Sequence, residues 1–112
     1  MQIEFRRESA CSIMTIPSKR LDYMNVNGFK NQMLDLISQG HKRVILDMAN
    51  VESMDSKGLS AFLFLSRAVG PDGRVALVSV HEQVQKMLVL TRTDRILSVF
   101  NTLPEALAAI DQ

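Results

Sequence analysis

The sequence predicts an α/β fold in which a mixed, mostly parallel β-sheet of four to five strands packs against about four helices. Short apolar runs, which are typical of strands, alternate along the chain with segments whose apolar residues recur at helical spacing. Polar and helix-breaking residues separate these segments at short intervals, as in a compact domain. The 112 residues, of which 46% are hydrophobic, suit a single domain over residues 1–112 and leave little room for two.

The first two elements are predicted to be strands. Residues 2–8 alternate in polarity with Ile3 and Phe5 on one face, which predicts a half-buried strand. Residues 10–16 continue with β-branched and apolar side chains, so the two segments could form an antiparallel ribbon with a tight turn between them. Residues 17–25 are polar and are expected to form a loop.

From there on, helices and strands alternate. Apolar residues at helical spacing predict four helices, over residues 26–37, 59–68, 84–91 and 103–110. Continuous apolar runs predict three strands, over residues 44–46, 75–80 and 96–100. Gly40 is placed to end the first helix, and Thr102 followed by Glu105 forms a capping box at the last one. A loop is expected at residues 50–56. This order predicts parallel strands joined by right-handed crossovers.

The composition excludes several classes of protein. Lys and Arg total 13 against 12 Asp and Glu, and this net charge of +1 makes a large nucleic-acid footprint unexpected. No run of about 18 apolar residues exists to span a membrane. The first ten residues lack the apolar core of a signal peptide. Cys11 is the only cysteine, which fits a reducing cytoplasm, and we expect it to be a small core residue.

Enzymatic chemistry has little support in the sequence. Ser56 lacks the G-x-S-x-G elbow, and His41 and His81 are expected to be surface residues at element boundaries. A triad of Ser56, His81 and Asp47 stays open, although nothing recommends it. One cysteine and two separated histidines show no metal-ligand spacing, and no glycine-rich phosphate loop occurs. We therefore expect no catalytic residue, no metal site and no cofactor.

A response-regulator receiver domain is the competing α/β interpretation at this length. That domain needs an acidic pair after its first strand, an aspartate after its central strand and a lysine near its last strand. Asp47 could imitate the aspartate, but no acidic pair follows Ile3 and Phe5, and no lysine lies near residues 96–100. Without a carboxylate cluster there is no magnesium site, so this interpretation is rejected.

The most pointed local feature is the segment D-S-K-G-L at residues 55–59, between a predicted strand and a predicted helix. Asp55 or Ser56 can cap that helix, because a side-chain oxygen there accepts a hydrogen bond from a free backbone N–H. The Ser56 hydroxyl is also an accessible phosphoacceptor. A phosphate there would face unpaired N–H groups and the positive end of the helix dipole, and would add about −1.5 to −2 charges. Lys57 could partly neutralise it.

V-I-L-D at residues 44–47 and M-D-S-K-G-L at residues 54–59 resemble the central signature of STAS domains. More narrowly, they resemble the bacterial anti-sigma factor antagonists. The resemblance extends over nearly the whole chain. Leu21 and Asp22 follow the second predicted strand as the family's loop motif does, and F-N-T at residues 100–102 precedes the last helix as in the family.

The resemblance implies a partner switch built on the STAS fold. In that family the unmodified protein binds an anti-sigma factor, often a GHKL-type serine kinase, and so frees the kinase's other client, commonly a sigma factor. Phosphorylation of the serine after the motif aspartate, Ser56 here, turns this off, and a PP2C-type phosphatase reverses it. The family's docking surface maps onto six residues: Asp22, Asp55, Ser56, Lys57, Gly58 and Leu59. We expect a cytoplasmic, non-enzymatic regulator that is a monomer or weak dimer and binds neither nucleic acid nor membrane.

Two positions depart from the family's pattern. The residue after the phosphoserine is usually small, whereas this chain has Lys57, which could alter the choice of partner. The turn after the third helix usually holds a Gly-Leu pair, whereas this chain has Arg92 and Thr93, which could alter the loop conformation.

Three alternatives stay open. A single-domain chain of this kind also resembles SypA-type regulators of biofilm and polysaccharide production, whose target need not be a sigma factor. The protein could instead be a STAS scaffold subunit, in a stressosome-like assembly or beside a transporter. The third alternative is a small enzyme that uses Ser56 as a nucleophile.

Overall fold

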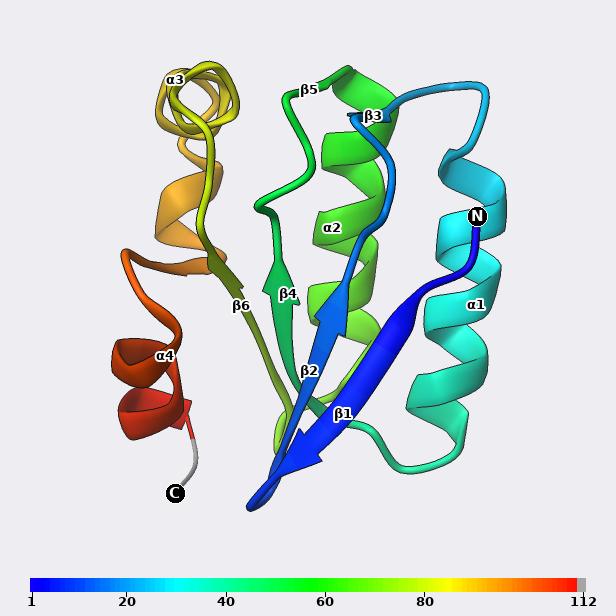
Figure 1. Ribbon diagram of the computed structural model, residues 1–112, viewed down its shortest axis with the longest axis vertical. Helices are drawn as coiled ribbons and strands as arrows, with labels where there is room; N and C mark the ends of the chain where they lie inside the picture. The colour runs from blue at the N-terminus through cyan, green and yellow to red at the C-terminus, as the bar shows by residue number, and fades with distance from the viewer. Residues whose placement is uncertain (111–112) are drawn as a thin grey trace.

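Five strands form the main sheet of this computed structural model, which describes residues 1–110 (Figure 1). In sheet order they are β1 (Glu4–Glu8), β2 (Cys11–Thr15), β4 (Arg43–Asp47), β6 (Arg74–Val78) and β7 (Ser98–Phe100). β1 and β2 pair antiparallel, and every later pairing in this sheet is parallel. The mixed, mostly parallel sheet predicted from the sequence is therefore confirmed.

The α-helices of the described residues lie where helical spacing predicts them, within a few residues at each end. They are α1 (Val26–Ser38), α2 (Ser56–Ala68), α3 (Glu82–Leu90) and α4 (Leu103–Ile110). Gly40 ends α1 as predicted: its φ is +105°, and its N–H donates to the carbonyl of Ile37 at 3.0 Å. None of the helices within residues 1–110 is both long and apolar enough to cross a lipid bilayer.

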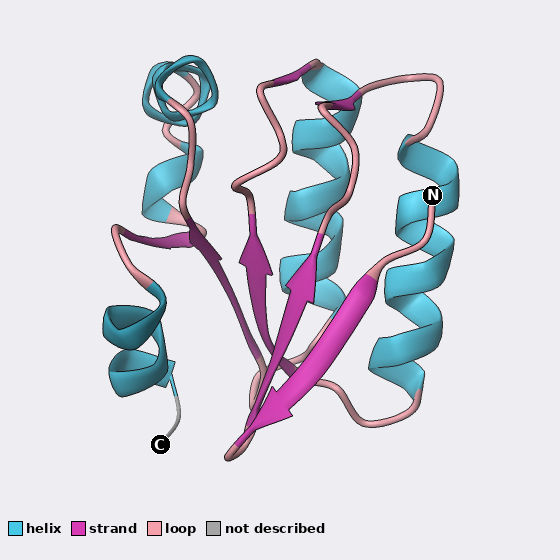
Figure 2. Ribbon diagram, viewed as in Figure 1, coloured by secondary structure: helices cyan, strands magenta, loops and turns pink. Residues whose placement is uncertain are grey.

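The sheet is covered on both faces because its central strands alternate apolar side chains between the two sides. Leu46 of β4 lies in the core with Phe29 of α1 and Phe62 of α2, whose ring centroids are 5.8 Å apart. The next residue back, Ile45, points to the opposite face and belongs to a second cluster with Ala106 of α4. Figure 2 shows α1 and α2 side by side on one side of the sheet and α4 on the other.

Two segments predicted to be loops each contain a short strand. Residues 17–25 contain β3 (Arg20–Leu21), and residues 50–56 contain β5 (Ser53–Met54). These two strands pair in parallel as a separate two-stranded sheet. The pairing depends on contact between distant parts of the chain, so local polarity could not reveal it. The two strands lie at the end of the molecule where α2 begins (Figure 1).

The prediction of a half-buried first strand is wrong for β1. Ile3 is buried but precedes the strand, and Phe5 keeps 49% of its surface exposed. β1 is the edge of the sheet and has no strand on its outer side. Phe5 therefore lies at the rim, where its ring packs edge-on against His41 with centroids 5.0 Å apart.

The last predicted strand, residues 96–100, begins later than expected. A single 3₁₀ turn, η1 (Thr93–Arg95), precedes it, and Ile96 points into solvent with 65% exposure. The turn follows Arg92, which adopts a left-handed conformation with φ +59°. Arg92 thus takes a conformation that glycine adopts without strain.

Candidate functional site

Asp55 caps the start of α2. One carboxylate oxygen, Oδ1, accepts hydrogen bonds from the backbone N–H groups of Lys57 and Gly58, each at 3.0 Å. These are among the N–H groups that have no partner within a helix. The sequence allowed either Asp55 or Ser56 to be the cap, and the structure shows that it is Asp55.

The other oxygen of Asp55 reaches a distant part of the chain. Oδ2 accepts a hydrogen bond from the backbone N–H of Tyr23 at 3.0 Å. Tyr23 belongs to the turn between β3 and α1, so one carboxylate connects the start of α2 to the segment that leads into α1. Backbone donors, of which Gly58 contributes most, hold the pKa of the Asp55 carboxyl below its usual value, whereas partial burial acts in the opposite direction. The carboxylate is therefore ionised at neutral pH.

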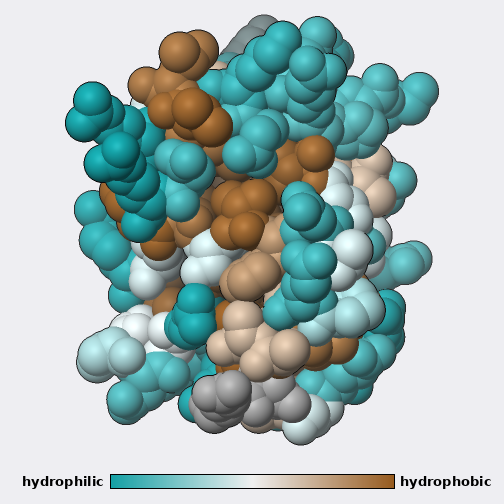
Figure 3. All heavy atoms as spheres, turned by 90° about the vertical axis from the view of Figure 1, so that its left-hand side faces the viewer, coloured by the Kyte–Doolittle hydropathy of each residue, from teal (hydrophilic) through white to brown (hydrophobic). Residues whose placement is uncertain are grey.

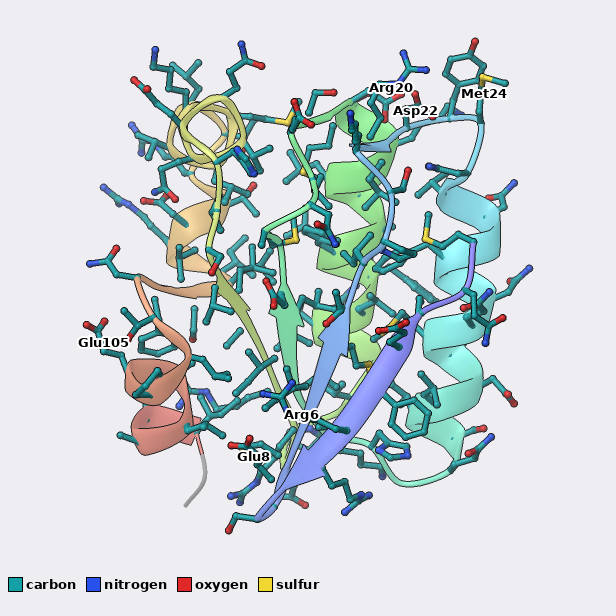
Figure 4. All side chains as sticks on the ribbon, viewed as in Figure 1. Arg6, Glu8, Arg20, Asp22, Met24 and Glu105 are labelled. Carbon is teal, nitrogen blue, oxygen red and sulfur yellow. The ribbon has the colours of Figure 1, made fainter. Side chains whose placement is uncertain are left out.

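Asp22 organises the same turn from within. Its backbone carbonyl accepts hydrogen bonds from Asn25 and Val26, and its Oδ1 accepts one from the N–H of Met24 at 3.0 Å. Arg20 Nε lies 4.0 Å from Asp22 Oδ2. Figure 4 shows Arg20, Asp22 and Met24 gathered at the end of the molecule where α2 begins. Asp22 and Asp55 thus lie on two segments that meet at one surface.

Ser56 is the first residue of α2 and is exposed. Among residues 1–110, its hydroxyl makes no hydrogen bond to another side chain or to the backbone. Because Asp55 already supplies the cap, the hydroxyl is not needed to complete the helix. A phosphate on this oxygen would lie at the positive end of the α2 dipole.

The remaining three residues of the predicted surface divide between exposed and buried positions. Lys57 is exposed, whereas Gly58 and Leu59 are buried, Leu59 with 8% exposure. A Cβ on Gly58 would lie 2.6 Å from the backbone carbonyl oxygen of Leu21. Gly58 thus lets α2 approach β3 closely, and Leu59 belongs to the hydrophobic core, so neither residue is exposed as Ser56 and Lys57 are.

Sequence reasoning missed two large exposed side chains beside this site. Tyr23 and Met24, in the turn before α1, are 67% and 75% exposed. Tyrosine and methionine are common in protein interfaces, because both supply much contact area. A large apolar pair within a polar loop, directly after Leu21 and Asp22, was the signal in the sequence that could have identified them.

The histidines do not build a catalytic site. His41 was expected at the surface but is buried with 8% exposure, and its Nδ1 lies 2.7 Å from Ser12 Oγ. His81 Nε2 lies 2.7 Å from the carbonyl oxygen of Ala49, and Asp47 Oδ1 accepts from the Ala49 N–H at 3.0 Å. These contacts do not lead to Ser56, so the triad left open by the sequence is not assembled.

The possible metal-ligating side chains and Cys11 also bear on the predictions from the sequence. Within residues 1–110, no three His, Cys, Asp or Glu side chains lie close enough together to hold a metal ion. Cys11 is fully buried, as expected of a small core residue.

A groove also lies away from the start of α2, between α3 and the ends of β6 and β7. Its volume is about 730 Å³, and its walls include Val89, Leu90, Val99 and Phe100. Leu90 is 84% exposed. Figure 3 shows apolar atoms gathered on this face, in its upper half, with hydrophilic side chains around them.

Both the sequence and the fold of this chain are similar to those of known proteins. The STAS domain model matches residues 2–106. A candidate anti-sigma factor antagonist of Thermotoga neapolitana is 32% identical over 100 residues, which make up 88% of this chain and 88% of that protein. The crystal structure of a candidate anti-sigma factor antagonist from Thermotoga maritima has a TM-score of 0.90 at 28% identity and covers 98% of this chain and 95% of that chain.

A more distant structure shares the fold alone. The Bacillus cell fate determinant SpoIIAA in its phosphorylated form has a TM-score of 0.71 at 18% identity, covering 97% of this chain and 99% of that chain.

Proposed function

The chain belongs to the STAS domain family, and from this premise we propose that it is a partner-switching regulator controlled by phosphorylation of Ser56. In its unphosphorylated form it binds an anti-sigma factor of the GHKL-type serine kinase class and releases that kinase's client. Phosphorylation by the kinase turns binding off, and a PP2C-type phosphatase restores it. Its relatives are anti-sigma factor antagonists, which are regulators and not enzymes, and we propose the same non-enzymatic role here, in the cytoplasm.

The observation that carries the proposal is the state of the Ser56 hydroxyl. It is exposed on the first residue of α2, and Asp55 satisfies the helix end without it. In the phosphorylation step, Oγ bonds to the γ-phosphorus of ATP, the bond from that phosphorus to the ADP oxygen breaks, and the hydroxyl proton passes to a base of the kinase. The oxygen belongs to an exposed residue at the surface of the molecule.

The phosphate acts on binding through its charge. It adds about −1.5 to −2 charges at neutral pH to a surface that the partner would desolvate. Placing a charge in such an interface costs several kcal/mol, and about 4 kcal/mol corresponds to roughly a thousandfold loss of affinity. One modification is therefore sufficient to turn the interaction off.

The test is a pull-down from the native cell with the Ser56→Ala chain as bait. Alanine cannot accept the phosphoryl group, so this chain should stay bound to its partner, and a GHKL-type kinase should be recovered. The Ser56→Asp chain, carrying a negative charge at the same place, should recover much less of it. Recovery of ribosomes or nucleic acid in place of a kinase would overturn the proposal.

A further inference from the structure

A polar groove runs between α1 and α2 directly beside Ser56. Its volume is about 280 Å³, and it is lined by Val26, Asn27, Lys30, Lys57, Ser60 and Ala61. Lys57 is the neighbour of Ser56 in the chain, and Ser60 lies one helical turn further along the same face of α2. A ligand in this groove would therefore lie against the proposed phosphorylation site.

The groove is positively charged. Its two ionisable residues are Lys30 and Lys57, and no carboxylate lines it. Within residues 1–110, neither lysine forms a salt bridge. The Lys30 ammonium lies 4.3 Å from the centroid of the Phe64 ring, so a cation–π contact holds it in place between the helices.

The carboxylates nearest along the chain are Asp55 for Lys57 and Asp35 for Lys30, and within residues 1–110 neither forms a salt bridge with its lysine. Both oxygens of Asp55 accept backbone N–H groups, from Lys57 and Gly58 on one side and from Tyr23 on the other. Within residues 1–110 neither ammonium group is paired with a carboxylate, although that of Lys30 also contacts the Phe64 ring, so both can meet a ligand that brings its own negative charge.

We propose that this groove receives a carboxylate-bearing segment of the partner kinase, and that Lys30 and Lys57 select for it. The inference rests on the proposed function and names the chemistry of the partner surface. Charge complementarity is the argument: two lysines without a carboxylate partner within residues 1–110 line a groove of about 280 Å³, which fits one or two Asp or Glu side chains.

The same groove explains the direction of the switch. A phosphate on Ser56 carries about −1.5 to −2 charges, which is close to the opposite of the two lysines. Phosphorylation would therefore cancel most of the positive charge of the groove and remove its attraction for an acidic segment. The partner is released because the charge that selects it has been cancelled.

The experiment measures affinity between the purified chain and the GHKL-type kinase that the Ser56→Ala bait recovers, by calorimetry with ADP present so that no transfer occurs. Lys30→Gln and Lys57→Gln should each weaken binding about two- to fivefold, and Lys30→Glu, which reverses the charge, should weaken it further. Raising the salt concentration should weaken wild-type binding and reduce these differences. Lys42→Gln is the matched control, because Lys42 is an exposed lysine that does not line the groove.

The Lys30→Arg variant tests whether the positive charge at residue 30, and not the lysine side chain itself, determines the affinity for the kinase. Arginine keeps both the positive charge and the contact with Phe64, so it should bind close to the wild-type level. Thermal unfolding of each variant checks that the fold is intact. Lysine variants that bind no more weakly than Lys42→Gln, in a kinase complex that phosphorylation still dissociates, would overturn this inference alone. Failure to recover any kinase would overturn the proposed function and this inference together.

Discussion

Asp55 is the residue on which the arrangement at the start of α2 depends. Its carboxylate holds N–H groups of Lys57 and Gly58 on α2 and of Tyr23 before α1, which joins two segments far apart in the chain. Because this one side chain caps the helix end, the cap does not require the hydroxyl of Ser56, which makes no hydrogen bond within residues 1–110. Modification of Ser56 would therefore leave the cap at the start of α2 in place, because the cap is supplied by Asp55.

Removing the cap should weaken the fold locally. We expect Asp55→Ala to lower the thermal unfolding midpoint, because the donors on α2 and in the turn lose their acceptor. Asp55→Asn should lie between Ala and the wild type, since an amide oxygen can still accept while the negative charge is lost. Thermal unfolding followed by circular dichroism would show this order. An Asp55→Ala midpoint equal to that of the wild type would mean that the cap contributes nothing.

His41 should make the fold sensitive to acid. Burial, and next the Arg7 guanidinium, lower the pKa of its imidazole below the usual 6.5. As the pH falls through that value, the unfolded chain takes up a proton that the folded chain resists, so the free energy of unfolding decreases. We expect the urea midpoint to fall between about pH 7.5 and about pH 5.5, and to fall less in His41→Gln. Equal decreases in both proteins would exclude His41 as the cause.

Among the elements, α2 approaches β3 closely because residue 58 is glycine. The carbonyl oxygen of Leu21 lies only 2.6 Å from the position of a Cβ at residue 58, and Met54 Cε lies 3.2 Å from it. A helix carrying a side chain there would have to move away from the small sheet formed by β3 and β5. Gly58 thus brings the Asp22 turn and the Ser56 end of α2 together.

Gly58→Ala should therefore destabilise the protein, by about 1–3 kcal/mol, because the obstructing atom is backbone and cannot rotate away. The matched control is Gly28→Ala on α1, where a Cβ meets nothing within 4 Å. That change should stabilise the protein by about 0.5–1 kcal/mol, since alanine favours a helix. Urea unfolding measures both. A loss of stability in both variants, or in neither, would contradict the account of Gly58.

The sequence was sufficient for the elements whose pattern is local. The helices and the central strands follow from apolar spacing, and Gly40 from the turn that it makes. It was insufficient where tertiary contact decides: β3 and β5 exist because they pair with each other, and Phe5 is exposed because β1 lies at an edge. At the site, the D-S-K-G-L motif predicted the cap at the start of α2, but it could not show that Asp55 accepts a hydrogen bond from the N–H of Tyr23 or that Lys30 and Lys57 line one groove.

For the whole molecule, the proposed switch lies at one end, apart from the core. The main hydrophobic cluster joins the sheet to α1, α2 and α3, and Ser56 is exposed outside it. A phosphate can therefore change the surface without disturbing the packing. We expect Ser56→Asp to keep the wild-type circular dichroism spectrum, and chemical-shift changes to concentrate around residues 20–25 and 55–61. Shifts spread across the sheet would mean that a negative charge at residue 56 acts by altering the fold.

The most direct measurement is the affinity of the recovered kinase for two forms of this chain, unmodified and phosphorylated at Ser56 alone, by calorimetry with ADP. The account predicts tight binding of the unmodified chain and a loss of roughly a thousandfold on phosphorylation, with Ser56→Ala behaving as the unmodified chain. Equal affinity for the two forms would contradict the claim that Ser56 controls the partner.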